Sequence, residues 1–252
     1  MRKKQKRGNL LALLIGYDDK KIYFWMIYSH SLRAYETIKL PRKWQNLDDK
    51  QVYNLLEDVV DIIRKVVRDG LKSILIASSH KNEYWKKLME HVTKHHKWLL
   101  KGYNRVSFGE VNGIANSLES AKNLVSKEES QQVVNEILSE EIYQLIVRLE
   151  KIINSGNPNA GFLYNLDEIE AIVYEGGKKD KIAAEKLDLI IITKNYINNQ
   201  KDKNRIHRLT QIAINKGIKV KMISIEDPSV DRFDQFGGIL AFKKEKQFIA
   251  DG

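Results

Sequence analysis

The sequence contains no cysteine in its 252 residues. Disulfide bridges, thiolate metal sites and cysteine nucleophiles are therefore excluded together, and the chain is compatible with a reducing compartment. Long apolar runs are missing as well, since no stretch approaches the roughly eighteen consecutive apolar residues of a membrane-spanning helix. A short apolar run, 10–15, follows basic residues as in a secretory signal, but it is too short and is broken at Gly16. We therefore expect a cytoplasmic protein with no membrane partner.

Acidic side chains are in deficit: 33 Asp and Glu face 43 Lys and Arg, which gives a formal net charge of +10. This balance favours a polyanionic partner, because Lys and Arg displace condensed counterions from phosphate backbones. Nucleic acid is favoured over an acidic protein, with anionic lipid third. Residues 1–8 form a basic arm, interpreted either as a phosphate-binding arm or as a disordered solubilising tail. Its basic residues are Arg2, Lys3, Lys4, Lys6 and Arg7.

The first half of the sequence alternates strand and helix patterns. Apolar residues with period two, or in short continuous runs, predict strands over 10–17, 21–29, 33–40, 71–77 and 98–108. Apolar residues at helical spacing predict helices over 49–69, 82–91 and 113–124. The run 71–77 is almost wholly apolar, which is typical of a strand covered on both faces. The first half of the sequence therefore predicts an α/β unit with a mixed or parallel sheet.

The second half repeats this alternation after a polar segment, 125–130, which we interpret as a junction. The predicted helices are 131–154, 167–174 and 205–215, and the predicted strands are 187–193, 219–225 and 239–242. The turn cluster after the long helix and the stop at Gly217 support these boundaries. The sequence therefore predicts two α/β domains, each a mixed sheet flanked by helices.

Three stretches resemble one known family, and they occur in that family's order. They are LKSILIASS at 71–79, RVSFGEVNGI at 105–114, and a C-terminal set in which the helix 204–216 is followed by GIKVKMIS and then by FGGILAF at 236–242. These stretches are similar to the middle and C-terminal domains of Pelota and of the archaeal and eukaryotic class I release factors. The resemblance implies a middle domain at 9–126 and a kink-turn-ribosomal-protein-like C-terminal domain at 127–248. The family's N-terminal, codon-reading domain has no counterpart in this sequence.

The resemblance draws attention to one loop. Release factors carry a Gly-Gly-Gln tripeptide between the third strand and the long helix of the middle domain, whereas the corresponding segment here, 40–48, contains no glycine. Gln45 is the only candidate for a catalytic glutamine. Pelota proteins have proline and basic residues at this place, and Pro41, Arg42 and Lys43 resemble that version. Arg42 and Lys43 would then contact RNA phosphate while an exposed Trp44 stacks on a base or sugar; the alternative is an ordinary connection with a core tryptophan.

Histidines at 91, 95 and 96 raise the question of a metal site, because His91 and His95 have the i, i+4 spacing of two ligands on one helix face. No third ligand is identifiable in the neighbouring sequence, and Lys94 and Lys97 add positive charge. A basic helix end or RNA-facing surface is the favoured interpretation. We expect no metal and no cofactor.

From these features we expect a non-catalytic ribosome-binding factor that occupies the A site in hibernation or in rescue of stalled ribosomes. The resemblance implies ribosomal RNA, transfer RNA and an elongation-factor-like GTPase as partners. Two alternatives stay open. One is an enzyme, either a divergent peptidyl-tRNA hydrolase or release factor that uses Gln45, or a tRNA nuclease. The other is a stand-alone RNA-binding module.

Overall fold

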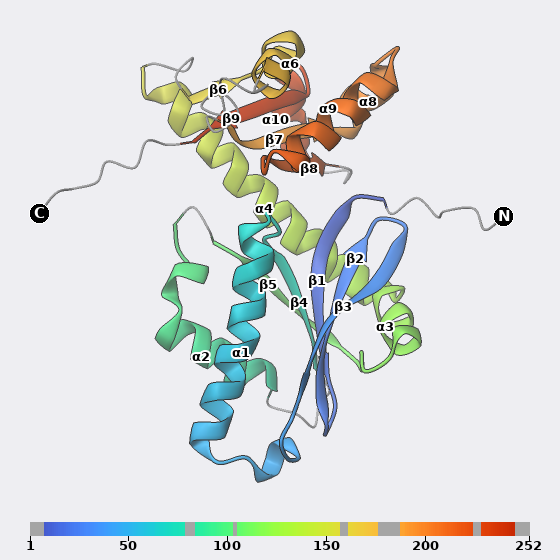
Figure 1. Ribbon diagram of the computed structural model, residues 1–252, viewed down its shortest axis with the longest axis vertical. Helices are drawn as coiled ribbons and strands as arrows, with labels where there is room; N and C mark the ends of the chain where they lie inside the picture. Colours follow the sequence, from blue (N-terminus) through green and yellow to red (C-terminus); the bar gives the residue numbers. More distant parts are fainter. Residues whose placement is uncertain are drawn as a thin grey trace, which may run out of the picture. The chain divides into compact units, whose positions relative to one another are not determined.

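The computed structural model describes residues 8–78, 84–102, 105–156, 161–175, 187–223 and 228–244. The chain divides into two compact units, Met1–Glu141 (unit 1) and Ile142–Gly252 (unit 2). Figure 1 labels their helices and strands. The basic arm, with Arg2, Lys3, Lys4, Lys6 and Arg7, lies outside the described residues.

Unit 1 is built on a five-stranded sheet with the order β3-β2-β1-β4-β5. The strands are β1 Leu10–Tyr17, β2 Lys21–Tyr28, β3 Ser31–Lys39, β4 Ser73–Ser78 and β5 Ser107–Asn112. Strands β1, β2 and β3 form an antiparallel meander, whereas β4 runs parallel to both β1 and β5. The sheet is therefore mixed, as predicted.

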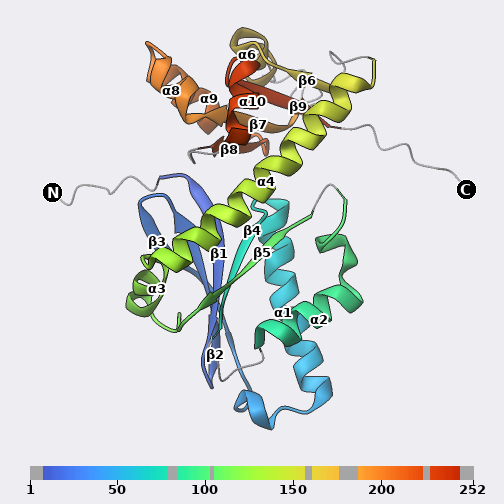
Figure 2. The same cartoon turned by 180° about the vertical axis from the view of Figure 1, so that it is seen from behind.

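Helices cover both faces of this sheet, which explains why every residue of β4 is buried. Helices α1 (Asp49–Arg68) and α2 (Tyr84–His95) pack on one face, and α3 (Leu118–Val125) and the first part of α4 (Glu128–Asn154) lie on the other (Figures 1 and 2). Helix α1 begins at a capping box in which the Asp48 side chain accepts from Gln51 N–H and the Gln51 side chain accepts from Asp48 N–H.

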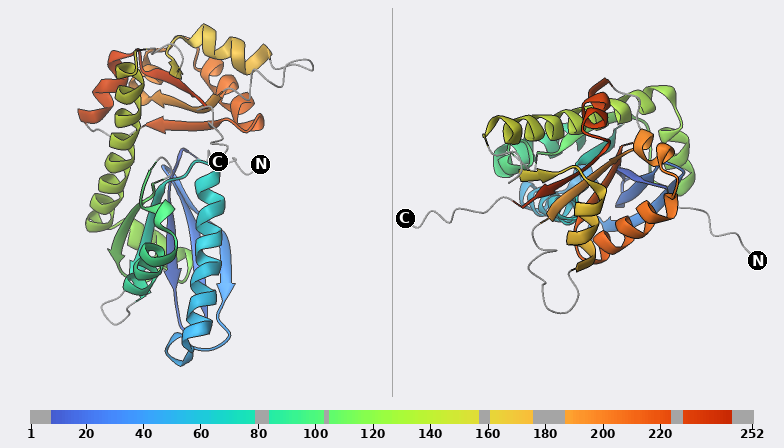
Figure 3. Two further views of the ribbon diagram at one scale, coloured as in Figure 1. Left: turned by 90° about the vertical axis from the view of Figure 1, so that its left-hand side faces the viewer. Right: turned by 90° about the horizontal axis from the view of Figure 1, so that it is seen from above.

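Unit 2 has a four-stranded sheet with the order β6-β9-β7-β8. Its strands are β6 Phe162–Leu163, β7 Leu187–Thr193, β8 Lys219–Ile223 and β9 Ile239–Lys243. Its helices are α6 Leu166–Glu175, α8 Lys194–Asn199, α9 Lys203–Asn215 and α10 Pro228–Gln235. Helices α6 and α9 pack on one face of the sheet, and α10 and the second part of α4 pack on the other (Figure 3).

The expected two α/β units with mixed, helix-covered sheets are confirmed. Three local expectations are wrong. The strand expected over 98–108 begins only at Ser107, because Lys97–Leu99 form a 3-10 turn closed by the Leu100 N–H bond to the Lys97 carbonyl, 3.1 Å. The helix expected from residue 113 begins at Leu118, where Ser117 caps it, and the junction 125–130 already belongs in part to α4.

The sequence interpretation also missed β6, α8 and α10. The two compact units divide inside α4, between Glu141 and Ile142. The domain limits implied by the resemblance, 9–126 and 127–248, stay a prediction. Within the described ranges, no helix is long and apolar enough to cross a membrane.

Candidate functional site

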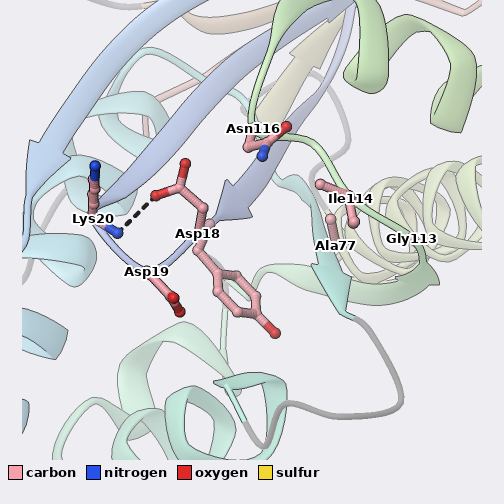
Figure 4. Close-up of a pocket in the computed structure, with 8 residues that line it drawn as sticks. Asp18, Asp19, Lys20, Ala77, Gly113, Ile114 and Asn116 are labelled. Carbon is pink, nitrogen blue, oxygen red and sulfur yellow. Dashed lines mark hydrogen bonds between the residues drawn. The ribbon is translucent and has the colours of Figure 1, made fainter. Parts of the chain in front are cut away.

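The carboxyl ends of three parallel strands meet at one edge of the unit 1 sheet. Ligands of open α/β sheets commonly bind outside this edge. A pocket of about 450 Å³ opens there (Figure 4). It is lined by Tyr17, Asp18, Asp19 and Lys20 from the end of β1 and the following turn, Ala77 near the end of β4, and Gly113, Ile114 and Asn116 after β5.

One wall of the pocket is held by close packing between β1 and the segment after β5. A Cβ atom at Gly16 would lie 2.2 Å from the Ala115 carbonyl oxygen, so only glycine fits there. The same oxygen accepts a hydrogen bond from the Trp25 indole N–H, 2.8 Å. The position of residues 113–116 is therefore fixed by a backbone contact and a buried hydrogen bond.

Asp18 shapes the turn between β1 and β2. Its carboxylate accepts from Lys20 N–H (2.8 Å), Lys21 N–H (2.9 Å) and the Tyr23 hydroxyl (2.9 Å). Burial raises the pKa of this carboxyl, but the bonds donated by Lys20, Tyr23 and Lys21 outweigh burial and leave the pKa below its ordinary value. Asp18 is thus an ionised acceptor committed to the turn, and it is a poor candidate for a general base.

We expect the Asp18→Ala variant to lower the free energy of unfolding by about 1–2 kcal/mol, because two backbone donors and a phenol lose their acceptor. Asp18→Asn should lower the free energy of unfolding less, since the amide oxygen remains as one acceptor. The stability that ionised Asp18 contributes is fully present above its unfolded pKa, about 3.9, and is lost as the pH falls through the lower folded value. Urea unfolding of both variants measures the difference; equal stability of wild type and Asp18→Ala would contradict this role.

The segment 40–48, which carries the residues singled out in the sequence, lies beside this turn. Leu40 N–H donates to the Lys20 carbonyl, 2.8 Å, and Lys43 Nζ lies 3.6 Å from Asp19 Oδ2. Arg42, Lys43 and Gln45 are exposed. The exposed cations Lys20, Lys39, Arg42 and Lys43 therefore gather at one end of the sheet, and we call them the loop-end surface.

Trp44 is half-buried rather than exposed. Its ring meets the ring of Tyr84 edge-on, with centroids 5.0 Å apart, and Lys87 Nζ lies 5.8 Å from its centroid. Tyr84 is itself buried against Tyr17, with ring centroids 4.3 Å apart. Trp44 thus anchors the loop to the core, and its role in RNA binding stays a prediction.

The histidines are arranged differently from the i, i+4 pair that the spacing suggests. His95 is exposed, whereas His91 and His96 are both buried and both face Glu57 of α1, with each Nε2 3.0 Å from Glu57 Oε1. Glu57 is the third group that the sequence did not reveal, because it lies 34 residues before His91. No signal in the local sequence connects the two helices.

A search of protein-family models finds no match, and neither does a search of curated protein sequences. Several solved structures match most of this chain, and two of them are described below. Dom34 of S. cerevisiae, described as a translation termination-like factor involved in RNA quality control and interacting with Hbs1, is 14% identical with a TM-score of 0.50, over 98% of this chain and 66% of Dom34. A model of ribosome-bound archaeal Pelota and ABCE1 is 12% identical with a TM-score of 0.53, over 92% of this chain and 61% of that chain.

The chain thus spans less than two thirds of the length of these two proteins. At this level of identity the match concerns the fold alone. It agrees with the family resemblance that the sequence stretches indicated. The fold of this chain is a Pelota and release-factor-like fold.

Proposed function

We propose that this chain is a non-catalytic ribosome-binding factor whose loop-end surface contacts ribosomal or transfer RNA. The observation that carries the proposal is the loop between β3 and α1. It presents Arg42 and Lys43 to solvent at the place where release factors have Gly-Gly-Gln. Exposed guanidinium and ammonium groups at the end of a rigid sheet are suited to phosphate contacts, which position a protein without reading sequence.

The structure of the loop favours binding over catalysis. It is anchored at both ends, by the Leu40 bond to Lys20 and by the capping box at Asp48, and Trp44 and Leu47 pack against the core between them. Nine residues so anchored cannot extend far from the domain, since even a free extended chain gains only about 3.3–3.6 Å per residue. Without a glycine, the loop also lacks the conformations that the releasing tripeptide uses.

The partners follow from the fold and from the charge. Archaeal Pelota has been described on the ribosome, and Dom34 has been described as interacting with Hbs1. We propose the same classes of partner here, the ribosome and an elongation-factor-like GTPase, with the net charge of +10 in support of an RNA surface. Occupation of the A site in hibernation or in rescue of stalled ribosomes is the role that suits a factor without a releasing loop.

The experiment is cosedimentation of the full-length chain with ribosomes from stationary-phase cells at low salt. The proposal predicts a stoichiometric complex that dissociates steeply as salt rises. The proposal is abandoned if the chain stays in the supernatant. Equal affinity for a purified RNA with or without ribosomal subunits would favour a stand-alone RNA-binding module instead.

A second measurement addresses catalysis through Gln45. We expect no release of labelled peptide from stalled ribosome complexes by the wild type, and no change on Gln45→Ala, because no glycine-bearing loop presents the glutamine. Incubation of the same complexes also shows whether transfer RNA stays intact. Glutamine-dependent release, or cleavage of transfer RNA, would make the chain an enzyme and overturn the non-catalytic role.

A further inference from the structure

Three potential metal ligands converge, from α1, from α2 and from the residue that follows α2. Glu57 projects from the middle of α1, His91 lies on α2, and His96 follows its last residue. Both imidazole Nε2 atoms lie 3.0 Å from the same carboxylate oxygen, Glu57 Oε1. One ligand atom from each of the three residues lies within 4.8 Å of the others. The side chains therefore already face one common point.

The three side chains differ in their exposure to solvent. The side chains of His91 and His96 are 5% and 10% exposed, whereas that of Glu57 is 31% exposed. Helices α1 and α2 contribute to the same hydrophobic core, which holds the three residues on rigid elements. Of the three side chains, the carboxylate is therefore the one most exposed to solvent.

The donor set and its spacing fit zinc. Zinc binds imidazole nitrogen at about 2.0–2.1 Å and carboxylate oxygen at about 2.0–2.2 Å, so two ligand atoms of a tetrahedral site are about 3.3 Å apart. The two Nε2–Oε1 separations of 3.0 Å come within a few tenths of an ångström of that spacing, and all three ligand atoms lie within 4.8 Å of one another. Three protein ligands of this kind leave the fourth tetrahedral position open.

We propose that Glu57, His91 and His96 form a Zn²⁺-binding site that joins α1 to the end of α2 and leaves one coordination position for water or another ligand. Tyr53, one helical turn before Glu57, donates its hydroxyl to the Glu57 carboxylate. Its ring also meets that of His91, with centroids 5.1 Å apart. Partners of this kind orient a metal ligand and commonly change metal affinity by about 10–100-fold when removed. Tyr53 is thus a positioning residue for the site.

His95, exposed on the next face of α2, has its ring centroid 4.9 Å from that of His91 and lies outside the ligand set.

The test uses the full-length chain freed of metal and titrated with Zn²⁺ by calorimetry, with Co²⁺ as a spectroscopic substitute. We expect one Zn²⁺ per chain, a rise in melting temperature with added Zn²⁺, and the intense visible bands of four-coordinate Co²⁺. Glu57→Gln and His96→Gln should weaken Zn²⁺ binding by about 100-fold or more, and Tyr53→Phe by about 10-fold. Circular dichroism of the metal-free variants checks that they fold.

The matched control is His95→Ala, which removes the histidine that sequence spacing pairs with His91 and should leave the affinity unchanged. Loss of binding in His95→Ala but not in Glu57→Gln would show a surface histidine pair and overturn the proposal. The wild-type chain gives a test that needs no variant: absence of Zn²⁺ binding, or the weak spectrum of six-coordinate Co²⁺, contradicts the site. None of these outcomes depends on ribosome binding.

Discussion

Reversal of the two loop charges in the Arg42→Glu/Lys43→Glu variant is expected to remove most ribosome cosedimentation at physiological salt. Each phosphate contact contributes about 0.7–0.9 units to the slope of log affinity against log salt concentration. The variant should therefore lower that slope by about 1.4–1.8 units and weaken binding by about tenfold or more at low salt. The loss should exceed that of simple neutralisation in Arg42→Ala/Lys43→Ala, because the new carboxylates repel phosphate.

The matched control is Lys122→Glu/Lys127→Glu, which makes the same change in net charge. Both lysines are exposed, and they lie at and just after α3, on the sheet face opposite the core to which the loop is anchored. If RNA contact is local to the loop-end surface, the control keeps most of its affinity and its salt slope. An equal loss in both double variants would show that net charge alone drives binding, and it would remove the loop from the interface.

The second large effect concerns unit 2, where Asp188→Ala is expected to lower the free energy of unfolding by about 2–3 kcal/mol. Arg148, whose side chain is only 7% exposed, lies with Nη1 2.9 Å from Asp188 Oδ2, and Lys219 Nζ lies 3.3 Å from Asp188 Oδ1. The guanidinium carbon is 4.4 Å from the centroid of the Phe242 ring. Removal of the Asp188 carboxylate leaves the desolvated Arg148 guanidinium without its main counter-charge. The resulting loss of stability exceeds what the ion pair itself contributes.

The control for Asp188→Ala is Asp167→Ala, because Asp167 pairs with Arg205 at the surface, where its side chain is 79% exposed. Exposed pairs contribute about 0–1 kcal/mol. Urea unfolding is followed by circular dichroism, since all 4 tryptophans lie in unit 1 and their fluorescence reports that unit. Equal losses in the two variants would contradict the special role of the buried pair.

The ion pair between Asp188 and Arg148 also predicts how stability depends on pH. Burial raises the pKa of the Asp188 carboxyl, but Lys219 and Arg148 outweigh burial and bring it below its ordinary value. The contribution to stability is therefore complete above the unfolded pKa, about 3.9, and is lost as the pH falls through the lower folded value. The difference in free energy of unfolding between wild type and Asp188→Ala should accordingly become smaller as the pH falls. A difference at pH 2 as large as that at neutral pH would contradict this assignment.

Elements with strong periodicity could be predicted from the sequence, whereas short and apolar segments could not. Helix α1 combines a capping box with apolar residues at helical spacing, and β4 is a continuous apolar run. The bounds predicted for both elements therefore lie close to those in the structure. The run beginning at Trp98 is also apolar, but pairing with β4 starts at Ser107, and Lys97–Leu99 form a 3-10 turn instead of a strand. Helix α10 is short and rich in aspartate, which made it resemble a turn.

The candidate site was visible in the sequence only where its residues are neighbours in the chain. The basic pair Arg42 and Lys43 could be singled out, whereas the remote walls of the pocket after β5 could not. The contact between Trp44 and Tyr84 also joins segments that are 40 residues apart, which is why the local sequence left both an exposed and a core tryptophan open. Tertiary packing decides such positions, and no local pattern encodes it.

An image of the full-length chain bound to ribosomes, reconstructed from complexes formed at low salt, tests the central claim most directly. The account predicts density for the chain in the A site, with the end of unit 1 that carries Arg42 and Lys43 against RNA in the peptidyl-transferase region. Density at another ribosomal site, or an A site left empty while the chain is bound elsewhere, would contradict it.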